Sequence, residues 1–359
     1  MVKQTDDIWQ DGRGSQMEKR TKRAGLAALL LLLLFLSGCA GKSETKTRYQ
    51  ISTTELFDTV SVIVGYAESE RTFRDTADRM IAELKEYHQL YDIYHTYEGL
   101  TNLKSLNDAA GGEALAVDER ILDLLDLART LWGKSGGKVD VTLGAVLRLW
   151  HEAREAGLAH PESAAPPDPE ALEEAARHTG FELLEIDREA GTVRLTDPEA
   201  SLDVGALAKG FACQRVCSRF EAGYLVNLGG NVYATGPKPE AGGAWGVGIQ
   251  DPDGSDYLYA VTLEKGAVVT SGDYQRYFEA EGKRLHHLID PDTLQPAARW
   301  RSVTILAEDS GIADGLSTAL FLMDREAGEA LLGEYGAEAA WISPAGEMLY
   351  TEGYRDRIR

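Results

Sequence analysis

The sequence has little cysteine and little positive charge, and each shortage excludes a class of protein. Three cysteines among 359 residues cannot supply a disulfide framework for a chain of this length. Lysine and arginine number 37 against 58 aspartates and glutamates, so the net charge of −21 excludes the basic surface of a nucleic-acid-binding protein. No repeat of fixed period runs through the chain, which excludes solenoid and fibrous folds. The 43% hydrophobic content is enough for one or two packed globular domains.

Motifs for three common chemistries are missing as well. The chain has no GxGxxG after an expected strand and no GxxxxGK[ST], the glycine-rich loops that bind dinucleotides and nucleoside triphosphates. Its cysteines and histidines do not cluster at the spacing of a zinc site. Rossmann, P-loop and zinc-dependent activities therefore have no support in the sequence.

The longest apolar run lies near the N-terminus, at residues 24–36, directly after a basic segment at 19–23. It is shorter than the roughly 20 residues that a membrane-spanning helix needs. A basic segment followed by a short apolar run predicts a signal peptide, here over residues 1–38. Met17 offers the more natural start, which makes residues 1–16 an extension ahead of it.

The end of this segment resembles a bacterial lipobox, Leu36-Ser37-Gly38-Cys39. In a lipobox the peptide is cleaved before the cysteine, and the thiol, here that of Cys39, carries the lipid. An ordinary secretory signal with an accidental cysteine is the alternative. The polar residues that follow predict a tether, so that residues 39–50 comprise the lipidated cysteine and its linker. We expect a lipid-anchored protein on the extracytoplasmic face of the cell membrane, the periplasmic side if the cell has two membranes.

Helices are expected in two groups. Apolar residues recur every three or four positions over residues 71–94, and Asp118 is a suitable N-cap for a second helix that ends at Gly136-Gly137. A proline-rich segment at 161–169 predicts a surface insertion. The remaining predicted helices are at 170–178, 312–323 and 326–335.

Strands dominate the second half and arrive as pairs around short turns. The turns are expected at residues 189–191, 265–266 and 344–346. Because strands come as hairpins and helices are grouped, the pattern predicts an α+β fold with mostly antiparallel sheets. It occupies residues 51–359, as one domain or as two subdomains.

Four clusters of Gly, Asp, Thr and His lie where expected strands and helices end. Singly, each has a structural explanation, because caps and turns use the same residue types. In this order along the chain they are much more specific. The clusters are residues 136–144, residues 202–210 with 226–231, residues 270–274 with 286–291, and residues 313–319.

Together these clusters resemble the ApbE family, the FAD:protein FMN transferases, from about Phe57 to Asp324. An early family segment ending in asparagine matches residues 97–107, and the family's FD-[IV]-T-x-G block matches 139–144. The remaining matches are LD-x-G-x-x-AKG at 202–210, NLGG at 227–230, TSGDY at 270–274, HHxIDP at 286–291 and D-x-x-x-T at Asp314 and Thr318.

The resemblance implies an ApbE-like architecture related to the T-fold, and a Mg²⁺-dependent enzyme with FAD as donor. FMN would pass to a Thr or Ser hydroxyl of a target flavoprotein through a phosphoester bond, and AMP would be released. Subunits of sodium-pumping or Rnf-type redox complexes are the expected targets. Two alternatives remain: a lipoprotein that binds or delivers flavin without transfer, and a Mg²⁺-dependent FAD pyrophosphatase.

The resemblance also assigns residues. Mg²⁺ would bind the carbonyl of Ala206 and the side chains of Asp314 and Thr318, and His287 would transfer a proton or stabilise phosphate. Such hard oxygen ligands suit Mg²⁺, which would also offset the repulsion between a diphosphate and an acidic protein. The residues expected to contact FAD are Phe57, Tyr97, Lys138, Val139, Asp140, Asp203, Lys209 and Leu288.

The chain departs from the family pattern at three places. Phe57-Asp58-Thr59 stands where the family has Met-Gly-Thr, which leaves the contact of residue 57 with the flavin ring open. Lys138 replaces a small or aromatic residue, and Asn231 stands where many relatives carry Asp.

Overall fold

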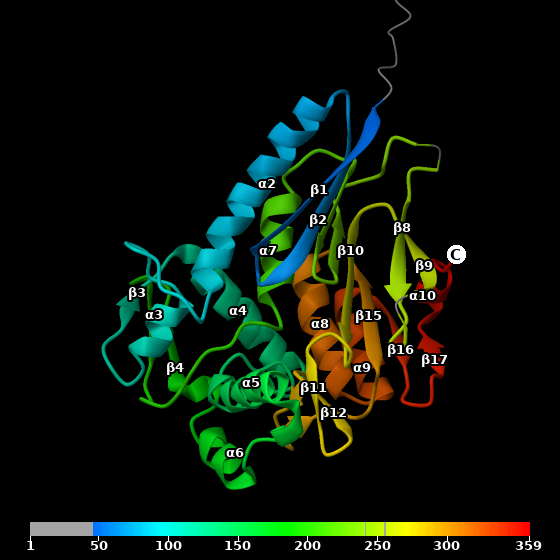
Figure 1. Cartoon of the computed structure of the whole chain (residues 1–359). Helices are drawn as coiled ribbons and strands as arrows, with labels where there is room; N and C mark the ends of the chain where they lie inside the picture. The colour runs from blue at the N-terminus through cyan, green and yellow to red at the C-terminus, as the bar shows by residue number, and fades with distance from the viewer. Residues whose placement is uncertain (1–45, 241, 255) are drawn as a thin grey trace, which may run out of the picture. The chain divides into compact units, whose positions relative to one another are not determined.

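The computed structural model describes residues 46–240, 242–254 and 256–359. The predicted signal peptide, Cys39 and the beginning of the tether lie outside the described residues. Within the described ranges no helix is both long and apolar enough to cross a membrane. Residues 46–359 form one contact-rich unit, and Figure 1 shows its helices and strands.

An eight-stranded sheet forms the centre of this unit, and every neighbouring pair of its strands is antiparallel. This confirms the predicted α+β fold with mostly antiparallel pairing. Strand β1 begins at Thr47, so residues 47–50 of the predicted tether are strand instead. The order across the sheet is β1 (Thr47–Leu56), β2 (Thr59–Ala67), β6 (Tyr224–Leu228), β7 (Asn231–Ala234), β10 (Gly266–Gly272), β15 (Ser302–Ala307), β16 (Glu338–Ile342) and β17 (Met348–Tyr350).

Alternate residues of the sheet face two separate cores. In β10, for example, Ala267 and Val269 join one core and Val268 joins the other, as the two-residue period of a strand requires. The hairpin of β8 (Trp245–Gln250) and β9 (Tyr257–Leu263) and the short α10 (Glu352–Arg355) cover the second face (Figure 1). The first face is covered by α2 (Glu70–Tyr91), α4 (Glu119–Lys134), α7 (Ala208–Cys217), α8 (Ser310–Leu322) and α9 (Arg325–Tyr335).

The predicted helices are present near their expected bounds. Helix α2 buries the stripe that its periodicity predicted, and α4 follows Asp118, whose carboxylate accepts the N–H of Arg120. Helix α6 (Pro169–Ala176) corresponds to the prediction after the proline-rich segment. Helix α5 (Gly144–Ala159) was not predicted. No side-chain cap marks its start, and the N–H of Gly144 is instead held by the distant carbonyl of Ser201.

Two of the three predicted hairpins are confirmed and one is wrong. Strands β4 (Leu184–Asp187) and β5 (Thr192–Leu195) pair, as do β16 and β17. Strands β9 and β10, expected to pair across Lys265-Gly266, belong to different sheets: β9 pairs with β8, and β10 pairs with β7 and β15. Val261 of β9 and Val268 of β10 share the second core, so the two strands lie in layers on either side of it.

A third core lies beside the sheet. It packs α5 and α6 against the hairpin of β11 (Tyr277–Ala280) and β12 (Lys283–His286), with Trp150 and Phe278 at its centre. The remaining described elements are short: α3 (Leu103–Asp108), β3 (Leu115–Ala116), the single turns η2 (Pro161–Ser163) and η3 (Phe181–Leu183), and the pair β13 (Ile289–Asp290) and β14 (Gln295–Pro296).

Candidate active site

Asp314 connects two of the predicted motifs. It lies inside α8, whose N-cap is Asp309, and its side chain is almost fully buried. Its Oδ2 accepts the N–H of Gly210 at 2.8 Å, and the Nζ of Lys209 lies 3.6 Å from the same oxygen. Burial raises the pKa of Asp314, while the Lys209 charge and the Gly210 N–H offset part of that rise. Thr318 lies one helical turn further on and is partly exposed.

Gly210 is the residue that allows this approach. A Cβ at position 210 would lie 2.5 Å from the Cβ of Asp314 and would also overlap the backbone carbonyl of Ser310. Only a residue without a side chain lets α7 pack this closely on α8. The glycine of the AKG motif therefore places the carboxylate against the start of α7.

The loop before α7 is closed by its own polar groups. The carboxylate of Asp203 accepts the N–H of Gly205 at 2.8 Å, and the Nζ of Lys209 donates to the carbonyl of Gly205 at 3.2 Å. Ala206 follows directly and is partly exposed. The loop leads into α7, where the ammonium of Lys209 lies near Asp314, and Ala206 precedes this lysine by three residues.

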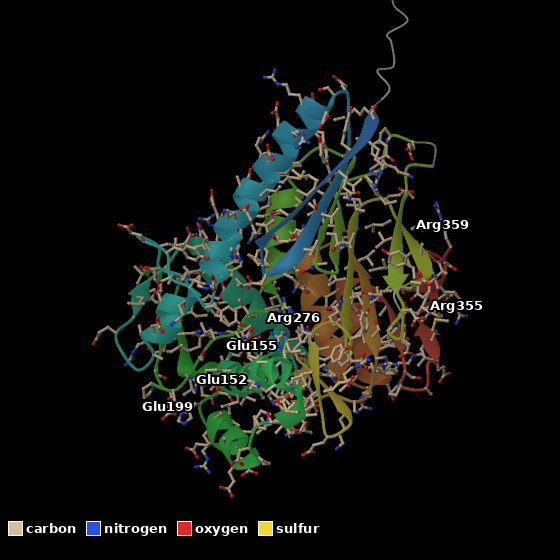
Figure 2. The ribbon with its side chains drawn as sticks, in the orientation of Figure 1. Glu152, Glu155, Glu199, Arg276, Arg355 and Arg359 are labelled. Atoms are coloured by element: carbon tan, nitrogen blue, oxygen red, sulfur yellow. The ribbon has the colours of Figure 1, made fainter. Side chains whose placement is uncertain are left out.

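The second histidine of the HH pair belongs to a positively charged cluster. The His287 backbone N–H donates to the carbonyl of Arg276 at 3.1 Å, and its side chain is open to solvent on one side. Crowding by protein and repulsion from the charges of Arg276 and Lys209 lower the pKa of His287 well below its ordinary value. The imidazole is therefore neutral at physiological pH and can accept a proton. Arg276 (Figure 2) was not predicted as a site residue from the sequence.

The first histidine has a structural role. His286 is buried; its Nδ1 accepts the N–H of Leu288, and its Nε2 contacts the Ala297 carbonyl at 2.8 Å. These two bonds require the neutral tautomer with the proton on Nε2. Burial lowers the pKa of His286, which favours that neutral form. The pair thus divides into one buried, hydrogen-bonded histidine and one exposed histidine.

Lys138 is held in ion pairs. Its Nζ lies 2.6 Å from Asp290 and 2.8 Å from Asp292, and its side chain is 17% exposed. The lysine therefore links the 136–144 cluster to the HHxIDP segment, and its charge is neutralised there. Asp140, also predicted to contact FAD, accepts hydrogen bonds from the backbone N–H and the hydroxyl of Thr142. Burial raises the pKa of Asp140. The side chains of Val139 and Leu288 are buried in the first core.

Phe57 forms the tip of the β1–β2 hairpin together with Asp58. Both residues have φ of 51°, the left-handed region that a two-residue hairpin turn requires and that non-glycine side chains rarely adopt. Its ring packs edge-on against His88 with centroids 5.6 Å apart, and its N–H donates to Nδ1 of the same histidine. Phe57, which departs from the family pattern, is therefore an aromatic residue held in a strained turn.

Two tyrosines, Tyr94 and Tyr97, lie in the segment that follows α2. The hydroxyl of Tyr97, predicted to contact flavin, donates to Asp92 at 2.8 Å. Tyr94, not predicted, is 48% exposed and packs against His151 at 5.4 Å. Partial burial and the nearby charge of Asp203 raise the pKa of Tyr94 to about 12, and Arg276 lies close enough to oppose that rise. Tyr94 is therefore near enough to both Asp203 and Arg276 to feel their charges.

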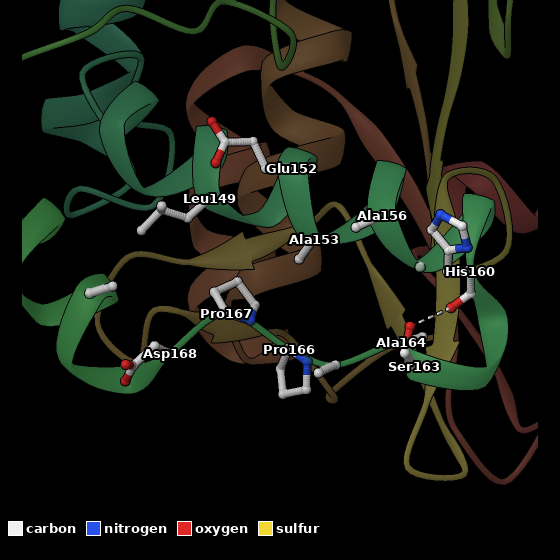
Figure 3. A pocket seen from close by; sticks show the side chains of 13 residues that line it. Leu149, Glu152, Ala153, Ala156, His160, Ser163, Ala164, Pro166, Pro167 and Asp168 are labelled. Atoms are coloured by element: carbon white, nitrogen blue, oxygen red, sulfur yellow. Dashed lines mark hydrogen bonds between the residues drawn. The ribbon is translucent and has the colours of Figure 1, made fainter.

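Two hollows flank α5. One of about 480 Å³ is lined by Arg154 and Leu158 of α5 and by Gln275, Arg276 and Phe278, so it adjoins the His287 cluster. Another, of about 400 Å³, lies between α5 and the proline-rich segment (Figure 3). The residues predicted for catalysis or binding do not line this second hollow.

The donor atoms fit a hard divalent cation. Within the described ranges no group of three His, Cys, Asp or Glu side chains is placed to hold a metal. One buried carboxylate, one hydroxyl and a main-chain carbonyl are instead oxygen donors, which suit Mg²⁺ when water and phosphate complete its coordination. The Asp314 carboxylate is buried beside a single lysine, so a further cation would be stabilised there.

Comparisons with known proteins agree on one family. The model of the ApbE family matches residues 46–341. The FAD:protein FMN transferase of Treponema pallidum is 38% identical over 277 residues, which cover 72% of this chain and 75% of that protein. That of Vibrio cholerae is 32% identical over 320 residues, covering 86% and 90%. The crystal structure of the ApbE protein from Thermotoga maritima superposes with a TM-score of 0.77 at 30% identity, covering 87% of this chain and all of that one.

Proposed function

The chain belongs to the ApbE family, and we propose that it is a Mg²⁺-dependent FAD:protein FMN transferase. It takes FAD as donor, moves FMN to a Thr or Ser hydroxyl of a target flavoprotein and releases AMP. The observation that carries this proposal is the meeting of Asp314 with Gly210 and Lys209, which joins two distant motifs around one buried carboxylate. Ala206 and Thr318 lie on the elements that flank it.

The phosphates need positive charge in a protein of net charge −21. Lys209 and Arg276 would supply it, and both lie close enough to His287 to lower its pKa. Mg²⁺ held by the Ala206 carbonyl, Asp314 and Thr318 would stabilise the charge on the diphosphate during in-line displacement. Asp203 orders the loop that presents Lys209 to the phosphates.

His287 accepts the proton of the acceptor hydroxyl at an imidazole nitrogen. The hydroxyl oxygen forms a bond to the FMN phosphorus as the bond from that phosphorus to the AMP phosphate oxygen breaks. The same charges that lower the pKa of free His287 are offset when an anionic diphosphate lies between them. Substrate binding would therefore offset the contribution of these two charges to the lowered pKa of His287, while the larger contribution of burial would remain.

The acceptor polypeptide approaches through the hollow beside Arg276. That hollow is the larger of the two flanking α5, and one of its lining residues is Arg276, whose charge reaches His287. The acceptor must bring a hydroxyl to His287 while FAD occupies the site, and His287 is exposed to solvent.

One assay separates the three candidate functions. The purified protein is incubated with FAD, Mg²⁺ and a flavoprotein domain that carries a Thr acceptor. Transfer gives a fluorescent band that survives denaturation, pyrophosphatase activity gives free FMN and AMP, and a delivery protein gives neither. Detection of free FMN alone, with a domain that a characterised relative does modify, would contradict the transferase proposal.

The proposal includes a place in the cell. A lipid on Cys39 would hold the protein at the extracytoplasmic face of the membrane, where exported flavoprotein subunits of sodium-pumping or Rnf-type redox complexes would be its targets. Radiolabelled palmitate should be incorporated into the wild-type protein and not into Cys39→Ser. Equal labelling of both would exclude this anchor.

A further inference from the structure

Asn231 is a buried amide with one half of its hydrogen-bonding capacity unused. It is the first residue of β7, after the tight turn at Gly229-Gly230, and its side chain has no exposed surface. Its Oδ1 accepts the hydroxyl of Ser310 at 2.7 Å. Its Nδ2, which carries two N–H donors, has no hydrogen-bond partner among the described residues. A buried donor left unpaired is unfavourable, so this one requires an explanation.

The unused Nδ2 lies beside the Asp314 carboxylate. A Cβ placed on Gly210 would be 2.9 Å from Nδ2 and 2.5 Å from the Cβ of Asp314, so both side chains converge on the same point of α7. The N–H of Gly210 already donates to Oδ2 of Asp314. The reverse orientation of the amide would turn its carbonyl oxygen toward a carboxylate, which is repulsive. The amide therefore presents its N–H groups to Asp314.

We propose that Asn231 is a positioning residue, whose Nδ2 donates to the Asp314 carboxylate and directs its remaining oxygen toward the cation. This inference rests on the proposed Mg²⁺ site. In the described arrangement Lys209 lies 3.6 Å from Asp314. A bond from Nδ2 to the Asp314 carboxylate would satisfy the donor that is otherwise unpaired.

An amide suits this position better than a carboxylate would. A carboxylate at position 231 would place a second negative charge against Asp314 in a buried pocket. The amide keeps the shape and the bond to Ser310 while it supplies donors. Polar groups behind a metal ligand commonly change metal affinity by 10- to 100-fold when removed.

Magnesium binding to the intact protein without FAD tests the proposal by calorimetry. We expect Asn231→Ala to weaken Mg²⁺ binding by about tenfold. The matched control Ser310→Ala, which removes only the partner of Oδ1, should stay within about twofold. A merely structural role would lower the melting temperature of both variants and leave the affinity of the folded protein for Mg²⁺ unchanged, which would overturn the proposal.

A second measurement needs no substitution at position 231. The chain has only four asparagines, Asn102, Asn107, Asn227 and Asn231, so selective ¹⁵N labelling gives few side-chain amide signals. Adding Mg²⁺ should shift the Asn231 signal downfield in the wild type and not in Asp314→Ala. If the wild type binds Mg²⁺ at Asp314 but this signal stays in place, the role of Asn231 is excluded while the proposed function stands. If the wild type binds no Mg²⁺ with or without FAD, the metal site itself is wrong and this inference falls with it.

Discussion

Replacing Gly210 by alanine tests whether close packing of α7 on α8 creates the site. An alanine inside a helix is normally favourable by about 1 kcal/mol relative to glycine. Here the added Cβ would lie 2.5 Å from the Cβ of Asp314 and overlap the carbonyl of Ser310. Overpacking of this kind costs about 1–3 kcal/mol. Separating the helices would also remove the N–H bond to a buried carboxylate, which costs about 1.5–3 kcal/mol.

The overlap and the lost hydrogen bond exceed the helical preference of alanine, so we expect Gly210→Ala to reduce the free energy of unfolding by about 3 kcal/mol. It should also weaken Mg²⁺ binding at least tenfold, because Asp314 loses its fixed orientation. Urea unfolding gives the first quantity and calorimetry of the folded fraction the second.

Gly333→Ala provides the matched control. Gly333 is exposed within α9, and an added Cβ would meet no described atom within 4 Å. This variant should be more stable than the wild type by about 0.5–1 kcal/mol and should bind Mg²⁺ unchanged. If Gly210→Ala is as stable as Gly333→Ala, the close approach of the two helices does not hold Asp314, and the reasoning is refuted.

Three further predictions follow from the site and its surroundings. Lys138→Met should lower the free energy of unfolding, measured in urea, by about 2 kcal/mol, because Asp290 and Asp292 lose their partner. The affinity for FAD should stay the same. A loss of FAD affinity without a loss of stability would instead support the flavin contact that the sequence predicted for Lys138. His287→Asn should abolish FMN transfer and spare FAD binding in a fluorescence titration, whereas full activity would remove His287 from the mechanism. The hydrogen bond to Asp197 raises the pKa of His178, so this pair stabilises the fold fully below the unfolded histidine pKa of about 6.5 and loses that contribution as pH rises through the raised value. Urea midpoints should therefore show the advantage of wild type over His178→Gln shrinking as the pH rises from 6 to 9, and a constant difference would contradict it.

Sequence patterns predicted the helices best where caps and apolar stripes coincide. Asp118 marks the start of α4, and the stripe of α2 needs no distant partner to be recognised. Helix α5 has no such signal, because Gly144 is fixed by the carbonyl of Ser201, far away in sequence. Strands β9 and β10 look like a hairpin locally, and only the layering of the second core separates them.

The candidate site likewise has residues that motifs predicted and residues that only the fold reveals. Asp314, Lys209 and His287 were predicted from motifs, and the structure brings them to one region. Arg276 and Tyr94 were missed, because each lies in a loop whose position is set by packing of the third core and of α2 rather than by local sequence. For Lys138 the sequence predicted a flavin contact, and only the fold reveals the two aspartates that neutralise its charge.

The dependence of AMP release from FAD on Mg²⁺ concentration, measured with the acceptor domain present and compared between the wild type and Asp314→Ala, tests the central claim most directly, because AMP is the leaving group of the transfer. Wild-type turnover should saturate with Mg²⁺, and the variant should bind FAD but show no stimulation at any Mg²⁺ concentration. A variant that releases AMP with the same Mg²⁺ dependence as the wild type would show that the metal acts somewhere other than at Asp314.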